Sequence, residues 1–382
     1  MTEERSESDS EGSSSDESMA SATISSEEED EEEEEEGHVV AKSVDSGKAH
    51  MDRSKGVSSK PSNAEIMALN ETALLFKSNL FKLQVDELLA ETLVAPNTKE
   101  TRGLDAALKQ IRDVLLSLKP VSEMPVDAAS KVVRKLGREC DGLLSIPFPD
   151  PAPPAGMSIK LGFRPPSLVN VAGSYALGMA ARTRSGFNVD VIAQMPSELF
   201  QERDHLNMRY FYKRAFYISM LFNGLKRSAI SESFDMTVDC LRNDLRLPVV
   251  TLRPRSDIRQ LAKLNCTVRI VPTIASDTLS LHRMGAGRNS IRPSFLIEGA
   301  SDEDELPATP QYNAALSADA LVVTHMSYLF ETTSVCADFA RAAALLRIWH
   351  GQRSMRGRKI GDQKLSGGRI NGFVLTMVLA WL

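Results

Sequence analysis

The stretch that decides the fold runs from Val169 to Ile192 and reads VNVAGSYALGMAARTRSGFNVDVI. An apolar run at its start ends in Gly173-Ser174, and a second apolar run carries Asn188 and Asp190 two positions apart. In a strand, side chains two positions apart point to the same face of the sheet. The stretch therefore predicts a strand, a tight turn with a short helix, and a second strand with a polar pair on one face.

This layout resembles the active site of a nucleotidyltransferase that has lost one carboxylate. In such a site, two carboxylates on one strand hold divalent metal ions against a nucleoside triphosphate for in-line displacement. A Gly-Ser pair just before a helix supplies backbone donors for the phosphates. Here the first carboxylate position is Asn188, which is neutral. This missing charge favours a non-catalytic scaffold with the fold of such an enzyme, rather than an active enzyme.

A third carboxylate would have to come from a neighbouring strand, and the best match is TVRIVP at residues 267–272. This run is similar to the strand of CCA-adding enzymes in which an acid precedes two apolar residues and a proline, but Arg269 stands in the acid's place. One carboxylate beside an arginine is a poor holder of two divalent ions. We expect Arg269 to pair with Asp190 instead. The predicted site is a vestigial nucleotide pocket with no catalytic residue, no metal and no cofactor, made of Gly173, Ser174, Asn188, Asp190 and Arg269.

Two other interpretations stay open. An active, template-independent RNA nucleotidyltransferase would need Asp190 to act with another carboxylate, such as Asp235 or Asp239. Those two acids alternate with apolar residues, which favours a solvent-facing position. A nucleotide-binding regulator would keep the Gly173-Ser174 cradle without chemistry and would bind triphosphate without metal.

The formal net charge of −6 conceals a strong asymmetry along the 382 residues. Residues 1–36 hold 17 acids and one base, a net charge of −16, whereas the rest holds 44 bases and 34 acids, a net charge of +10. A mildly basic body is typical of proteins that work near nucleic acid. Residues 1–62 contain few large apolar side chains, so we predict a disordered acidic tail.

Several serines of this tail are followed three residues later by an acid: Ser6, Ser8, Ser13, Ser14 and Ser26. This spacing suits an acid-directed kinase such as casein kinase two, and phosphates there would deepen the negative charge. An acidic solvating tail that is never modified stays an equal alternative.

Apolar spacing predicts helices over residues 63–93, 103–118 and 126–143, with their apolar stripes as packing faces. After a proline-rich connector, strands are expected at 158–163, 168–172, 187–193, 234–241, 249–253 and 266–273. Further helices are expected at 175–181, 203–225, 312–327, 334–352 and 373–382. In the helix at 203–225 we expect the aromatic residues to pack in the core and the bases to face solvent. The predicted class is α+β, a mixed sheet with helices.

The predicted domains are the tail (1–62), an N-terminal helical region (63–146), a degenerate nucleotidyltransferase-like domain (147–306) and the start of a helical domain (307–382). The chain stops inside an apolar run, so we expect it to be part of a longer protein. No apolar run reaches the roughly 18–20 residues needed to span a bilayer, so no membrane partner is expected. Four scattered cysteines show no metal-ligand spacing.

The sequence predicts a Gly-rich basic loop at 350–369, and this loop is the candidate RNA contact. Arginines on such a loop can follow a phosphate backbone. The residues singled out are Arg353, Arg356, Arg358 and Lys359. A solvated loop between domains is the alternative.

Several segments in collinear order over residues 65–382 resemble the Nrap family, the nucleolar RNA-associated proteins. They are FKSNLFKLQVDELL (76–89), VAGSYALG (171–178), NVDV (188–191) followed by Met195-Pro196, LNMRYFYKRAFY (206–217) and ALLRIW (344–349). The resemblance implies a degenerate nucleotidyltransferase-like domain followed by a helical domain like that of poly(A) polymerases and CCA-adding enzymes.

The same resemblance implies a function and a set of partners. The expected role is a non-catalytic scaffold of the small-subunit processome, the U3 small nucleolar ribonucleoprotein particle (90S pre-ribosome) that processes pre-18S ribosomal RNA. The expected partners are pre-ribosomal RNA, an rRNA-processing protein and casein kinase two. The expected location is the nucleolus, within the nucleus.

Overall fold

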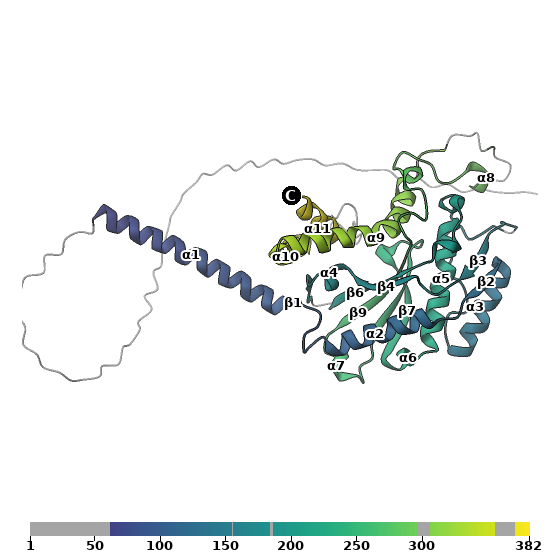
Figure 1. The fold of residues 1–382 in the computed structure, drawn as a ribbon, viewed down its shortest axis with the longest axis horizontal. Helices are drawn as coiled ribbons and strands as arrows, with labels where there is room; N and C mark the ends of the chain where they lie inside the picture. Colours follow the sequence, from purple (N-terminus) through teal and green to yellow (C-terminus); the bar gives the residue numbers. More distant parts are fainter. Residues whose placement is uncertain (1–61, 155, 184–185, 297–300, 302–305, 356–370) are drawn as a thin grey trace, which may run out of the picture. The chain divides into compact units, whose positions relative to one another are not determined.

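The computed structural model describes residues 62–154, 156–183, 186–296, 301, 306–355 and 371–382. The chain divides into two units at Asn63, and the second unit, Ala64–Leu382, contains the sheet and the helices that position the candidate site (Figure 1). The predicted acidic tail lies outside the described residues except for its last residue, Ser62. All of the candidate phosphorylation serines lie outside the described residues. The proposed domain boundaries at 146 and 306 stay predictions.

The centre of the second unit is a five-stranded mixed sheet in the order β4-β6-β9-β8-β7. β6 and β9 run parallel, whereas the other neighbouring pairs are antiparallel. The strands are β4 (Leu168–Ala172), β6 (Phe187–Gln194), β7 (Phe234–Cys240), β8 (Pro248–Pro254) and β9 (Cys266–Thr273). A mixed sheet accompanied by helices confirms the α+β class.

The longer helices are α1 (Asn63–Thr92), α2 (Arg102–Ser117), α3 (Val126–Cys140), α5 (Arg209–Lys226), α9 (Pro310–Val335), α10 (Phe339–Met355) and α11 (Gly372–Trp381). Short helical turns are α4 (Gly173–Ala176), η1 (Ser197–Leu199), η2 (Glu202–His205), α6 (Ile230–Ser233), η3 (Leu241–Asn243), α7 (Arg259–Ala262), η4 (Leu281–Met284) and α8 (Pro293–Leu296). Two small antiparallel pairs join β1 (Leu93–Val94) to β5 (Ala180–Ala181) and β2 (Val121–Pro125) to β3 (Lys160–Phe163). In the described ranges, no helix is long and apolar enough to cross a membrane.

The two faces of the sheet pack against different helices (Figure 1). Val191 belongs to the larger hydrophobic core, which includes the buried faces of α2 and α5. Its neighbour Ile192 belongs to a smaller core with residues of α9 and α10. Because successive side chains of a strand point to opposite faces, α2 and α5 cover one face of β6, and α9 and α10 pack on the other.

Two predicted helices differ from the structure for local backbone reasons. The helix expected at 175–181 is reduced to the single turn of α4, since Gly178 takes a left-handed conformation (φ +67°) and the chain continues into β5. The helix expected from 203 begins only at Arg209. Asn207 and Met208 have left-handed φ values of 53° and 63°, which separate η2 from α5.

The aromatic residues of α5 are buried, as predicted: Tyr210, Phe211, Tyr212, Phe216 and Tyr217. The expectation that the bases of this helix face solvent is wrong for Arg214, which is fully buried, and for Lys213, whose side chain is 10% exposed and pairs with Asp204 at 2.6 Å. Its Nε donates to Asp319 Oδ2 of α9 at 2.7 Å, and the hydroxyl of Tyr210 donates to the same oxygen at 2.8 Å. Burial raises the pKa of Asp319, while the Arg214 charge opposes that shift. This buried pair holds α9 against α5.

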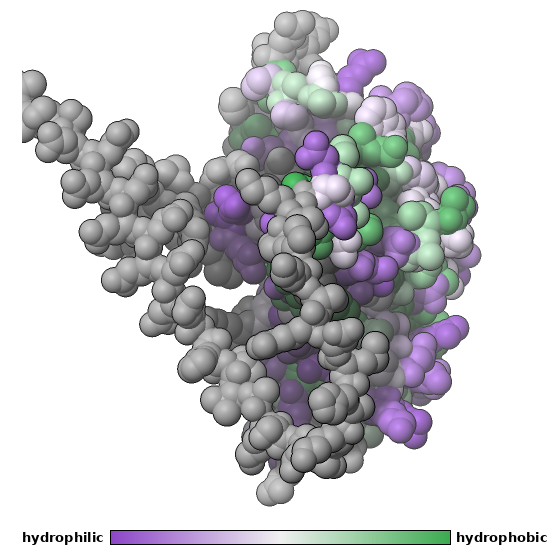
Figure 2. Space-filling model, turned by 90° about the vertical axis from the view of Figure 1, so that its left-hand side faces the viewer, coloured by the Kyte–Doolittle hydropathy of each residue, from purple (hydrophilic) through white to green (hydrophobic). Residues whose placement is uncertain are grey.

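The apolar stripe of α1 is not a core face over most of its length, which contradicts the prediction. Leu69 and Leu74 are 65% and 67% exposed. Only the end of the helix packs, with Leu89 buried and Val85 partly buried in the smaller core. Exposed apolar residues occur elsewhere too, and Figure 2 shows them interspersed with hydrophilic residues on one face.

Replacing Asp319 with Ala should lower the free energy of unfolding by about 3–5 kcal/mol, because it leaves the Arg214 charge buried without a partner. Urea denaturation measures this loss. The matched control is Asp235→Ala, which removes an exposed pair with Arg255 (3.0 Å) and should cost less than about 1 kcal/mol. Equal losses in the two variants would show that the buried pair does not hold α9.

Candidate functional site

The predicted pairing between Asp190 and Arg269 is present. β6 and β9 are neighbouring parallel strands, and their register places Asp190 beside Arg269. Arg269 Nε donates to Asp190 Oδ1 at 2.7 Å, and Nη2 donates to Oδ2 at 3.0 Å. Both side chains are partly exposed, at 27% for Arg269 and 29% for Asp190. Both carboxylate oxygens of the surviving acid are therefore engaged by a cation.

Asn188 lies on the same face of β6 as Asp190, as strand periodicity predicts, and is exposed. It adds no negative charge to this face. In the part of the chain that the structure describes, no group of three or more His, Cys, Asp or Glu side chains is placed to hold a metal ion.

The Gly173-Ser174 turn lies next to the Asp190–Arg269 pair. Gly173 opens α4 with a left-handed φ of +72°, and a Cβ at this position would lie 3.2 Å from Asp190 Oδ2. The backbone N–H of Gly173 donates to the Sδ atom of Met326, which comes from α9, at 3.3 Å. A thioether therefore accepts from the backbone donor that a phosphate oxygen would need in the predicted cradle. The carbonyl of Ser174 accepts from the backbone N–H of Met179 at 2.8 Å.

The surroundings of this turn are apolar. Met326 belongs to the smaller core, which connects the ends of β4 and β6 to α9 and α10. Its buried members are Leu89, Ala172, Leu177, Met179, Ile192, Met326, Leu329, Phe339, Ala343 and Ala344. The helical segment that follows the sheet thus packs directly beside the Gly173-Ser174 turn.

The acids that an active enzyme would need are elsewhere. Asp235 and Asp239 lie on β7 and are exposed, as expected from their alternation with apolar residues. Asp235 pairs with Arg255 at 3.0 Å, and Asp239 lies 3.9 Å from Arg253. β8 and β9 separate β7 from β6 in the sheet, so these acids do not join Asp190.

The candidate RNA segment is described only in part. Residues 350–355 continue α10. Residues 350–352 agree with the helix expected at 334–352, and the prediction of a loop is wrong for 353–355. The guanidinium of Arg353 lies over the ring of Trp349, 5.7 Å from its centroid. Arg356, Arg358 and Lys359 lie outside the described residues. Their proposed contact with RNA stays a prediction.

Replacing Gly173 with Ala tests the crowding at the vestigial pocket. Gly178→Ala is the matched control, since Gly178 has a similar φ of +67° but open space around its Cβ position. The left-handed backbone should cost each variant about 1–2 kcal/mol of unfolding free energy. Gly173→Ala should lose roughly 1 kcal/mol more, because Asp190 is held by Arg269 and cannot move aside freely. The extra loss should vanish in an Asp190→Ala background; if it persists there, Asp190 is not its cause.

The family model for Nrap protein domain 1 matches residues 127–335, which include the whole five-stranded sheet. Nucleolar protein 6 of Mus musculus is 32% identical over 324 residues, 84% of this chain and 25% of that protein. The Homo sapiens protein of the same name is 31% identical over 328 residues, 84% of this chain and 26% of its own length. U3 small nucleolar RNA-associated protein 22 of Saccharomyces cerevisiae is 27% identical over 329 residues, 83% of this chain and 25% of its own length.

The chain spans about a quarter of the length of these curated relatives. Their names confirm the expected location in the nucleolus of the nucleus. The family model covers more than half of the chain, including the strands that carry Asp190 and Arg269. The chain belongs to the Nrap family.

Proposed function

We propose that this chain is a non-catalytic scaffold in ribosome biogenesis, part of an assembly factor of the small-subunit processome that acts in pre-18S rRNA processing. The relatives' names, which refer to the nucleolus and to association with U3 small nucleolar RNA, support the setting. The observation that carries the non-catalytic role is the two-point contact of Arg269 with Asp190.

Electrostatics explains why this pair opposes metal-assisted chemistry. Two divalent ions need several carboxylate oxygens, whereas this face of β6 and β9 offers one carboxylate whose charge Arg269 already balances. Each pair of like unit charges at roughly 4 Å repels by about 4 kcal/mol near a protein surface. A divalent cation beside Arg269 would meet this repulsion with Asn188 contributing no charge to offset it.

The contact of Met326 with Gly173 supports the same conclusion for nucleotide binding. A triphosphate in the cradle would have to displace the thioether and break its packing in the smaller core. A thioether is only a weak acceptor, so the packing of Met326 in the smaller core, more than its hydrogen bond, opposes that displacement. The scaffold interpretation is therefore favoured over both the active transferase and the nucleotide-binding regulator.

The proposed partners follow from the family resemblance. They are pre-ribosomal RNA and the U3 small nucleolar ribonucleoprotein, together with an rRNA-processing protein and casein kinase two. In this proposal the nucleotidyltransferase-like sheet and the adjoining helical segment provide a rigid surface for RNA and protein contacts, not a reaction centre.

The test is nucleotide incorporation onto a short RNA in the presence of Mg²⁺ or Mn²⁺, using the full chain and an Asp190→Ala variant. Neither protein should extend the RNA above the background of a reaction without protein. Incorporation by the unmodified chain that disappears in the variant would show an active transferase and overturn the proposal.

A further inference from the structure

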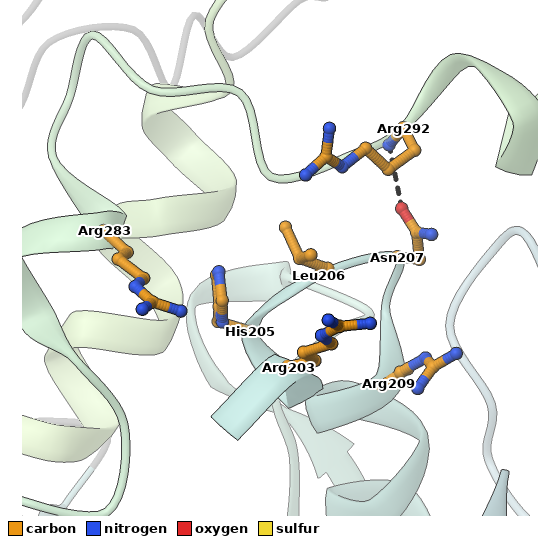
Figure 3. Close-up of a pocket in the computed structure, with 7 residues that line it drawn as sticks. All are labelled: Arg203, His205, Leu206, Asn207, Arg209, Arg283 and Arg292. Atoms are coloured by element: carbon orange, nitrogen blue, oxygen red, sulfur yellow. Dashed lines mark hydrogen bonds between the residues drawn. The ribbon is translucent and has the colours of Figure 1, made fainter. Parts of the chain in front are cut away.

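A concave site lies at the junction of η2 and α5, and none of the residues that line it belongs to the Asp190–Arg269 site. It has a volume of about 620 Å³, within the range of ligand pockets of about 300–1,000 Å³. Figure 3 shows its lining, which contains four arginines and no carboxylate: Arg203, His205, Leu206, Asn207, Arg209, Arg283 and Arg292. We call this site the arginine pocket.

Among the residues that the structure describes, most of the positive charge in the arginine pocket has no acidic partner. Arg283 pairs with Glu202 at 2.8 Å, but both side chains are substantially exposed. The guanidinium groups of Arg203, Arg209 and Arg292 form no ion pair or hydrogen bond with any residue in the described ranges. Like charges gathered in one concavity repel each other, and a bound anion relieves that repulsion.

The floor of the arginine pocket is held in a strained conformation. Asn207 and Met208 are consecutive non-glycine residues with left-handed φ values, which cost about 1–3 kcal/mol each. Contacts to other segments maintain this shape. The backbone N–H of Arg292 donates to Asn207 Oδ1 at 2.8 Å, as drawn in Figure 3. The backbone N–H of Met208 donates to the hydroxyl of Tyr312 at 3.2 Å, and that hydroxyl donates to the carbonyl of His205 at 3.0 Å.

The wall of the arginine pocket formed by the segment around Ser290 is also held by α9, the helix that carries Tyr312. The backbone N–H of Asn207 donates to the carbonyl of Ser290 at 2.9 Å, and the Ser290 hydroxyl donates to Asn313 Oδ1 at 2.6 Å. Asn313 Nδ2 donates to the carbonyls of Gly285 and Arg288, both at 2.9 Å. The backbones that carry the four arginines are therefore fixed relative to each other before any ligand arrives, which lowers the entropy cost of binding.

We propose that the arginine pocket binds the phosphate groups of single-stranded RNA. Guanidinium groups match phosphate oxygens with two parallel hydrogen bonds. Leu206 and Asn207 provide an apolar contact and an amide between the cations, and these suit a ribose or a base. This site rests on the proposed function, since it names where the scaffold holds RNA, and it is separate from the predicted segment at 350–369.

An acidic protein segment is the other polyanion that arginines attract. A carboxylate peptide carries its charges on flexible side chains, whereas an RNA strand places a phosphate at every nucleotide and fills a concave site of nucleotide size. The balance of charge in the body of the chain, +10 outside residues 1–36, also favours a nucleic acid.

The test compares two triple variants of the full chain by fluorescence anisotropy with a labelled single-stranded RNA of mixed sequence. The pocket variant carries Arg203→Gln, Arg209→Gln and Arg292→Gln. The control carries Lys131→Gln, Arg134→Gln and Arg138→Gln, which remove the same charge from exposed residues of α3. The pocket variant should bind RNA at least about tenfold more weakly at low salt. Its slope of log affinity against log salt should fall by about 2, as expected for three lost phosphate contacts.

The control should change the affinity and the salt slope by much less. Equal losses in both triple variants would show diffuse attraction and overturn the proposal, as would an unmodified chain that does not bind RNA. A loss of binding to poly-glutamate but not to RNA would identify an acidic-peptide site instead. Arg292→Glu alone should also weaken RNA binding, which guards against a triple variant that fails to fold.

The RNA-binding test and the nucleotide-incorporation test can fail independently of each other. RNA binding that survives in the pocket variant overturns the arginine pocket and leaves the scaffold proposal standing. Nucleotide incorporation that depends on Asp190 overturns the non-catalytic role and leaves the pocket standing.

Discussion

The buried ion pair between Arg214 and Asp319 fixes α9 on α5, and both sites of this molecule depend on where α9 lies. Near its start, Tyr312 and Asn313 hold the walls of the arginine pocket. About 20 Å further along the helix, at 1.5 Å per residue, Met326 reaches the Gly173 turn. One helix therefore shapes the strained arginine pocket and also contacts the Gly173 turn.

The Asp190–Arg269 pair links two neighbouring parallel strands of the sheet. In an enzyme of this shape, carboxylates on neighbouring strands repel each other until metal ions bind between them. Here an arginine on β9 neutralises the surviving acid directly, so the two parallel strands are linked without a metal. In the role that we propose, this face keeps the sheet of an enzyme without the negative charge that phosphoryl transfer needs.

Local periodicity explains what could be predicted from the sequence. Asp190 and Arg269 lie on strands with strong apolar patterns, so the two strands followed from residue spacing. Their partnership followed from the resemblance of residues 267–272 to the third-carboxylate strand of CCA-adding enzymes. Met326 could not be predicted, because its contact with Gly173 joins residues 153 positions apart through the packing of a whole helix. Arg214 was misplaced because a base on a helix usually marks the solvent face, and only its buried partner on α9 reverses that rule.

The arginine pocket had no sequence signal at all. Its arginines are spread between residues 203 and 292 without a motif, and hydrogen bonds through α9 bring their segments together. The clearest local sign is the left-handed pair at Asn207 and Met208; asparagine tolerates that conformation, but methionine gives no sequence sign of it. By contrast, the basic run at 350–369 stood out in the sequence, and α10 extends into its first residues.

The central claim is that the face with Asp190 and Arg269 holds no catalytic metal ion. The measurement that tests it most directly is Mn²⁺ binding, monitored by electron paramagnetic resonance in the presence of a non-hydrolysable nucleoside triphosphate. It compares the unmodified chain with Asp190→Asn and with Asn188→Asp/Arg269→Asp, which restores three carboxylates. We predict that the first two show the same Mn²⁺ binding as a protein-free nucleotide solution and that the restored variant gains a protein-bound ion. Stoichiometric Mn²⁺ on the unmodified chain, lost in Asp190→Asn, would contradict the account.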